Sequence, residues 1–172
     1  MSAELTPSGG TRESRQVEGK AFARRFCNLL CELQLQPGIY RRIERIIQDF
    51  GMDKPLLRAV YLSRSVDPSY FAEEAYGATA ADRPQLQALV IEGRNLYEFL
   101  AFAQGFRSHV TSISTIVNIE ETWLEPEPSQ PFVFRACLYH SFPAATILYA
   151  PDGDLQEYAT QFLDSMKSVR GF

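Results

Sequence analysis

The chain has 172 residues, of which 45% are hydrophobic and 22% charged, and its formal net charge is −4 at pH 7. This composition is that of a globular protein with a sizeable core, and the acidic balance argues against a surface devoted to nucleic acid or anionic membranes. The three cysteines form no disulfide framework, and no apolar run reaches the roughly 20 residues that span a bilayer. We therefore expect a reduced protein in the cytoplasm or the nucleus.

Two amphipathic helices are predicted after a polar N-terminal segment. Residues 1–17 are rich in Ser, Gly, Thr and Glu, which predicts a flexible tail before a single domain at 18–172. The first helix is expected from Glu18 to Leu35, with an apolar stripe at Phe22, Phe26, Leu29, Leu30 and Leu33. The second is expected at 39–50, with Gly51 as its stop and with Ile39, Ile43, Ile46, Ile47 and Phe50 on one face.

The middle of the chain is also predicted to be mainly helical. Start signals at Asp53 and at Asp67-Pro68 predict helices at about 53–64 and 68–77. The stretch "PQLQALVI" (84–91) fits either a strand or a helix, and we favour the helix. The stretch "RNLYEFLAFAQGF" (94–106) is predicted to be helical because its apolar residues recur at helical spacing.

The hydrophobic period changes to two in the last third of the chain. Apolar and polar residues alternate in "ISTIVNIEETWL" (113–124) and "FVFRACLYH" (132–140), which predicts antiparallel strands, and "AATILYA" (144–150) predicts a third. Asp154, with Glu157 three residues later, is read as the capping box of a final amphipathic helix. The fold class is therefore α+β: N-terminal helices, then a three-stranded or slightly larger antiparallel sheet covered by a C-terminal amphipathic helix.

Residues with catalytic or metal-binding chemistry are few. The only histidines are His109 and His140, and Cys137 lies three residues before His140, so on a strand the two side chains point to opposite faces. Cys27 and Cys31 lack a second pair of ligands for zinc. No nucleotide-binding or hydrolase motif is present, so we predict no catalytic residue, cofactor or metal and do not favour an enzyme.

A second apolar stripe on the first helix is the main candidate for a partner surface. At about 100° per residue, Cys27, Cys31 and Leu35 share a face with Lys20 and Arg24, away from the principal stripe. Three interpretations fit this face: packing within the chain, contact with a partner or a second copy, or a thiol activated by the neighbouring basic residues.

Charge is segregated along the sequence. Basic residues cluster at 18–45, where the candidate anion-binding set is Arg24, Arg25, Arg41, Arg42 and Arg45. Acidic residues surround the only tryptophan, with Glu125 and Glu127 following Trp123. Alternation places Trp123 on the apolar strand face and favours its burial, whereas an exposed Trp123 in an acidic loop would form a docking element. Basic helices and an acidic loop in one chain also permit head-to-tail self-association.

These observations favour a non-enzymatic protein–protein interaction or assembly protein, such as an adaptor, a complex subunit or a dimeric chaperone-like module. Its partner-binding residues are expected among Arg24, Cys27, Cys31, Leu35, Trp123, Glu125 and Glu127. One alternative is a module that binds a small apolar ligand between sheet and helices. Another is an RNA- or anionic-lipid-binding protein that uses the five arginines of the first two helices.

Overall fold

The computed structural model describes residues 16–66, 84–125, 128 and 132–172. The predicted helix at 68–77, most of the predicted tail and Glu127 lie outside these described residues. Two helices, α1 (Gly19–Cys31) and α2 (Pro37–Asp53), come first. Nine strands or strand fragments and a last helix, α4 (Gly153–Arg170), complete the described chain.

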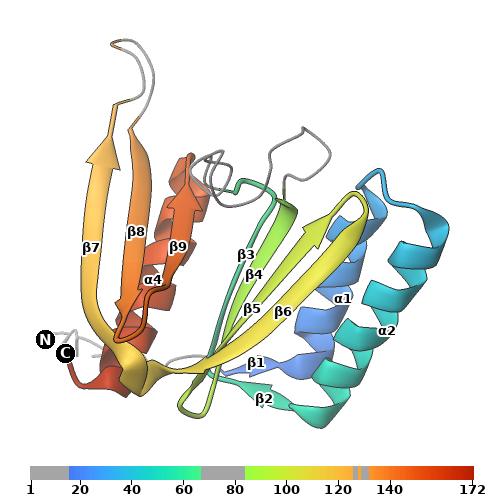
Figure 1. The fold of residues 1–172 in the computed structure, drawn as a ribbon, viewed down its shortest axis with the longest axis horizontal. Coiled ribbons are helices and arrows are strands. Elements are labelled where there is room, and N and C mark those ends of the chain that lie inside the picture. The colour runs from blue at the N-terminus through green and yellow to red at the C-terminus, as the bar shows by residue number, and fades with distance from the viewer. Residues whose placement is uncertain (1–15, 67–83, 126–127, 129–131) are drawn as a thin grey trace, which may run out of the picture.

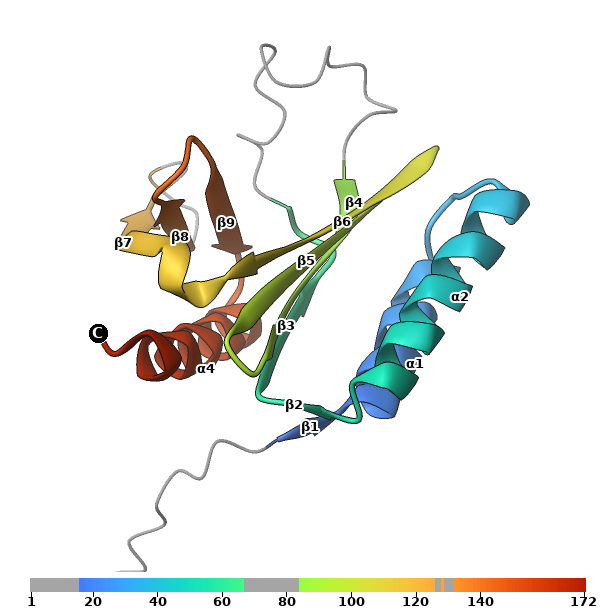
Figure 2. The same ribbon diagram turned by 60° about the horizontal axis from the view of Figure 1, so that its bottom comes forward.

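The centre of the molecule is a four-stranded antiparallel sheet in the order β3-β4-β5-β6. Its strands are β3 (Ala59–Ser63), β4 (Pro84–Glu92), β5 (Asn95–Phe102) and β6 (Gly105–Ser112). The hairpin between β4 and β5 turns at Gly93, whose φ of 58° is a conformation that glycine adopts without strain. The helices α1 and α2 lie side by side against one face of this sheet (Figures 1 and 2).

A second antiparallel sheet, in the order β7-β8-β9, lies on the other side. It consists of β7 (Ile116–Leu124), β8 (Val133–His140) and β9 (Ala145–Ala150), and a 3₁₀ turn at Ile113–Thr115 connects it to β6. The helix α4 packs on this sheet and on β3, so it fills the angle between the two sheets (Figure 2). A short pair of strands, β1 (Val17–Glu18) and β2 (Leu56–Leu57), ties the start of α1 to the end of α2.

Two hydrophobic cores therefore use opposite faces of β4. Leu86, Ala88 and Val90 point towards α1 and α2, whereas Leu89 and Ile91 point towards α4. Successive side chains of a strand alternate between faces, so a strand buried on both sides must be apolar at nearly every position.

The α+β class, the N-terminal helices, the three-stranded sheet and its covering helix are confirmed. The helices predicted at 53–64, 84–91 and 94–106 are wrong, since these residues form β2, β3, β4, β5 and the start of β6. For 84–91 and 94–106 the reason is burial on both faces: β4 and β5 have no polar face, and without that alternation their apolar spacing resembles that of a helix.

Three predicted helix boundaries are also wrong. The first helix ends at Cys31 and not at Leu35, so Leu35 lies outside the helix whose second stripe it was predicted to share. Gly51 does not end α2 but lies within it, where a Cβ atom would come 2.5 Å from the carbonyl oxygen of Gly19. Glycine is needed there because the two chain segments approach so closely. At the other end of the chain, Asp152, not Asp154, caps α4 by accepting a hydrogen bond from the Leu155 amide at 2.9 Å.

Candidate functional site

The edge strand β6 is the most exposed part of the four-stranded sheet. It is last in the strand order and pairs only with β5 among the described strands. Its central residues Ser108, His109 and Val110 are exposed, and Val110 leaves 52% of its surface in solvent. An edge strand presents main-chain N–H and C=O groups that a further strand can pair with. β6 is therefore a place where an extended chain can add to the sheet.

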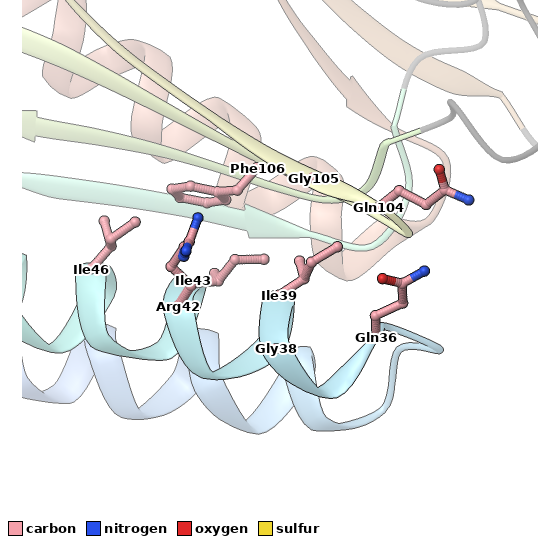
Figure 3. Close-up of a pocket in the computed structure, with 9 residues that line it drawn as sticks. All are labelled: Gln36, Gly38, Ile39, Arg42, Ile43, Ile46, Gln104, Gly105 and Phe106. Atoms are coloured by element: carbon pink, nitrogen blue, oxygen red, sulfur yellow. The ribbon is translucent and has the colours of Figure 1, made fainter.

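A groove of about 490 Å³ lies directly beside the start of this edge. It runs between α2 and the turn that joins β5 to β6 (Figure 3). Its apolar surface comes from Ile39, Ile43, Ile46 and Phe106, and its polar side chains are Gln36, Arg42 and Gln104. None of these described lining residues carries a nucleophile or a carboxylate, so the groove is suited to binding and not to acid–base chemistry.

The helix side of the groove follows from the spacing of residues in α2. Ile39, Ile43 and Ile46 recur at intervals of four and three, which places them on one face of a helix. Ile43 is 1% exposed and anchors α2 to the core, whereas Ile46 leaves 42% of its surface in solvent. The helix thus buries one part of its apolar stripe in the molecule and presents the next part to the groove.

The sheet side of the groove is held by aromatic packing. The ring of Phe106 stacks on Phe99 with centroids 6.0 Å apart, and it meets the ring of Phe26 edge-on at 6.5 Å. Phe26 and Phe99 belong to the buried core between α1, α2 and the sheet. A partner would therefore meet a preorganised surface, which lowers the entropy lost on binding.

The five arginines of the predicted anion-binding set are all exposed on α1 and α2. Within the described part of the chain, no carboxylate lies within ion-pair distance of Arg24, Arg25, Arg41, Arg42 or Arg45. Only Arg42 lines the groove, where Figure 3 shows its guanidinium beside Phe106. The two helices therefore carry exposed positive charge, and Arg42 places part of it beside the start of β6.

The second stripe of α1 faces α2 of the same chain in part. Cys27 is buried in the core between the helices and the sheet, where burial and then the Glu44 carboxylate raise the pKa of its thiol to about 11. Leu35 is half-buried against the same core. Cys31 is exposed, with its sulfur 2.9 Å from the Tyr40 hydroxyl, and Arg24 is also exposed.

Trp123 does not have the buried position that strand alternation favoured. It contacts Phe134 with ring centroids 4.9 Å apart, yet it remains 55% exposed. β7 is an edge strand of its sheet, and the contact with the buried Phe134 shows that the alternation correctly indicated the strand face of Trp123 but not its burial. Leu124 and Glu125, which follow it, are exposed as well.

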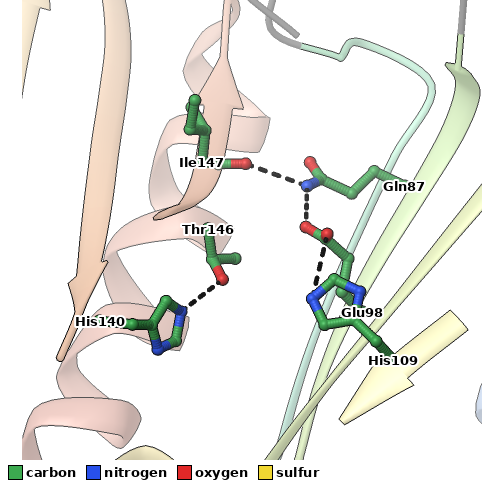
Figure 4. A network of polar contacts seen from close by, with 6 residues as sticks. All are labelled: Gln87, Glu98, His109, His140, Thr146 and Ile147. Carbon is green, nitrogen blue, oxygen red and sulfur yellow. Dashed lines mark hydrogen bonds and ion pairs between the residues drawn. The ribbon is translucent and has the colours of Figure 1, made fainter. Parts of the chain in front are cut away.

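A buried polar network between the sheets was missed by the sequence analysis. The Gln87 side-chain amide donates to Glu98 Oε2 and to the Ile147 carbonyl, each at 3.0 Å, and His109 Nε2 lies 3.7 Å from Glu98 Oε1 (Figure 4). Glu98 is only 4% exposed. A single carboxylate inside the apolar run "NLYEFLAF" was the available signal, because a buried charge requires donors nearby.

His140 forms a second polar contact that joins three segments. The Thr115 hydroxyl donates to the Ser112 carbonyl at 2.7 Å, so His140 Nδ1 must donate to Thr115 Oγ1 at 2.9 Å. His140 Nε2 then accepts from the Thr146 hydroxyl at 3.0 Å. Burial, followed by the nearby His109, lowers the pKa of His140, which favours this neutral form.

No group of three His, Cys, Asp or Glu side chains among the described residues is placed to hold a metal ion. Among the described helices, none combines the length and the apolar character needed to cross a bilayer. The chain matches no protein-family model, no curated protein and no solved structure.

Proposed function

We propose that the chain is a non-enzymatic protein–protein interaction or assembly protein that binds an extended segment of a protein in the groove between α2 and β6. One observation carries this proposal: an exposed sheet edge and an apolar groove lie directly side by side. Peptides that add to a sheet edge gain affinity from main-chain hydrogen bonds and specificity from pockets for alternate side chains. This chain offers both features at one place.

The bound segment pairs with the free edge of β6 and directs every second side chain towards α2. An apolar side chain then covers Ile46 and Phe106, which removes their exposed surface from water. The Arg42 guanidinium sits at the border of the groove and favours an acidic residue in the partner.

The small-ligand alternative is less well supported. The groove volume of about 490 Å³ is within the range of small-molecule sites. Three polar side chains line it, however, and it is continuous with a sheet edge that a small apolar molecule would leave unpaired. A peptide uses both the groove and the edge, so we favour a peptide.

Selection of peptides tests the proposed function. A display library of random 12-residue peptides is selected on the full chain, and the binders are measured by fluorescence polarisation with Ile46→Glu and Met52→Glu as matched variants. Both residues are exposed on α2, at 42% and 68%, but only Ile46 lines the groove. We expect Ile46→Glu to weaken binding about tenfold or more and Met52→Glu to change it less than about twofold. Equal effects of the two variants, or a library without binders, would contradict the proposal.

A second candidate function rests on the five exposed arginines. They have no carboxylate partner in the described part of the chain, as expected of a surface that binds RNA or anionic lipid. The test is binding to mixed-sequence single-stranded RNA and to phosphatidylserine vesicles as salt is raised, with Arg41→Glu and Arg45→Glu as variants outside the groove. Salt-dependent binding that both variants weaken would favour this candidate, whereas no binding at low salt would remove it.

A further inference from the structure

We infer that the segment bound in the groove is the C-terminal end of β7 with the residue that follows it, Trp123–Glu125, from a second copy of this chain. The inference rests on the proposed function, because it names the occupant of the same groove. It makes the protein a self-assembling one, in which the β7 edge of one copy extends the four-stranded sheet of the next.

The proposed docking segment is exposed on a free strand edge. β7 is the outer strand of the order β7-β8-β9 and pairs only with β8 among the described strands. At its distal end Trp123 is 55% exposed and Leu124 is 41% exposed, so two large apolar side chains are adjacent on one free edge. Tryptophan is strongly enriched among residues that dominate binding energy at protein interfaces.

The docking segment and the groove carry complementary charges. Glu125 is exposed, and within the described part of the chain it forms no ion pair. In an extended chain the side chains of residues 123 and 125 point to the same side, so both can face α2 of the other copy. Trp123 then occupies the apolar part of the groove, and Glu125 reaches Arg42 at its border.

The docking segment and the groove lie far apart within one molecule. β7 lies at one end of the molecule and α2 at the other in both views of the fold (Figures 1 and 2). The docking segment therefore does not reach the groove of its own chain, and the occupant must come from another copy. The two contacting surfaces differ, so the contact is head-to-tail and each copy retains one free surface of each kind.

A charge-exchange experiment on the full chain tests this inference. Sedimentation is measured over a range of concentrations at low salt for the wild type, for Arg42→Glu, for Glu125→Arg and for an equimolar mixture of the two variants. All of the exchanged side chains are exposed, so each variant should keep the wild-type circular dichroism spectrum. Emission from Trp123, the only tryptophan of the chain, gives an independent readout because the indole leaves water on association.

The wild type should show a mean mass that rises with concentration and a shift of the emission to shorter wavelength. Each single variant places like charges opposite one another and should weaken association about tenfold, whereas the mixture restores opposite charges at every contact and should recover it to within about twofold. Trp123→Ala should abolish association, and Tyr158→Ala, at an exposed aromatic on α4, should leave it unchanged.

A wild type that stays monomeric throughout, or a mixture no better than either variant alone, would overturn the inference. The proposed function would then still be decided separately, by whether Ile46→Glu weakens the binding of selected peptides. Self-association that persists in both single variants would place the contact elsewhere on the molecule and would equally overturn the inference.

Discussion

The side-chain amide of Gln87 donates a hydrogen bond of 3.0 Å to the main-chain carbonyl of Ile147, and this bond connects two sheets that share no strand pair. Gln87 belongs to β4 and Ile147 to β9. Two residues further along β9, the Tyr149 carbonyl accepts from the Tyr61 hydroxyl of β3 at 2.6 Å. Two side chains of the central sheet thus satisfy acceptors on the edge of the other sheet.

Replacing Gln87 with Ala should destabilise the fold. The side chain is fully buried, and its loss leaves the Ile147 carbonyl and the Glu98 carboxylate each without one donor. We expect a decrease of about 1–3 kcal/mol in the free energy of unfolding, measured by urea denaturation. Gln48→Ala, at an exposed glutamine of α2, is the control and should change it by less than about 0.5 kcal/mol. Equal stability of the two variants would show that the bridge contributes nothing.

The helix cap at Asp152 gives a second prediction. Its carboxylate accepts from the Leu155 amide, whereas Asp154 lies in the first turn of α4, where its negative charge interacts favourably with the helix dipole. Salt at about 1 M screens the interaction of both carboxylates with the helix dipole. Under this condition Asp152→Ala should lower the free energy of unfolding by about 0.5–2 kcal/mol, and Asp154→Ala should lower it much less. Thermal unfolding of both variants measures this difference, and a larger loss for Asp154→Ala would contradict the observed cap.

The free energy of unfolding should decrease at acidic pH because His140 becomes protonated more readily in the unfolded chain. Its pKa in the folded protein is lowered from the ordinary value of 6.5, so the unfolded chain binds the proton more readily. The stabilisation of the folded state by neutral His140 is therefore complete above about pH 6.5 and decreases as the pH falls below this value. Urea denaturation at several pH values should show that the free energy of unfolding decreases less steeply with falling pH in His140→Gln than in the wild type. His109→Gln retains His140 and its burial, which is the larger cause of the lowered pKa, and should keep most of the loss. An unchanged slope in His140→Gln would contradict the prediction.

The two cysteines of α1 should react at very different rates. Cys31 is exposed, whereas Cys27 is buried and its pKa is raised to about 11, which leaves about one thiol in a thousand ionised at pH 8. Labelling of the folded protein with a maleimide should therefore modify one thiol rapidly. Cys31→Ser should remove the rapid phase, and Cys27→Ser should retain it. Rapid labelling of Cys31→Ser would show that the core around Cys27 opens readily.

The correctly predicted elements are those whose sequence keeps a clear helical or strand period. The second helix has a continuous apolar stripe, and β7 and β8 retain enough alternation to be read as strands. β4 and β5 are buried on both faces, and their sequence does not reveal that α1 and α2 cover one face while α4 covers part of the other. The missed strands are thus those whose environment comes from distant segments.

The residues of the candidate site also fall into those that the sequence indicated and those that only the structure revealed. Arg42, Trp123 and Glu125 were all expected to contact ligands or partners from charge and aromatic character alone. Ile39 and Ile46 looked like ordinary core residues, and Phe106 carried no signal at all. Their grouping into a groove depends on where the β5–β6 turn lies relative to α2, which is a property of the tertiary structure.

The sequence by itself determined the α+β class, the two amphipathic helices and the separation of basic helices from an acidic strand end, because these depend on local periodicity and charge. The tertiary structure decided that β6 and β7 are free edges, that Cys27 is core, that Trp123 is exposed and that Arg42 borders a groove. Exposure is set by which segments pack against a residue, and those segments lie far away along the chain.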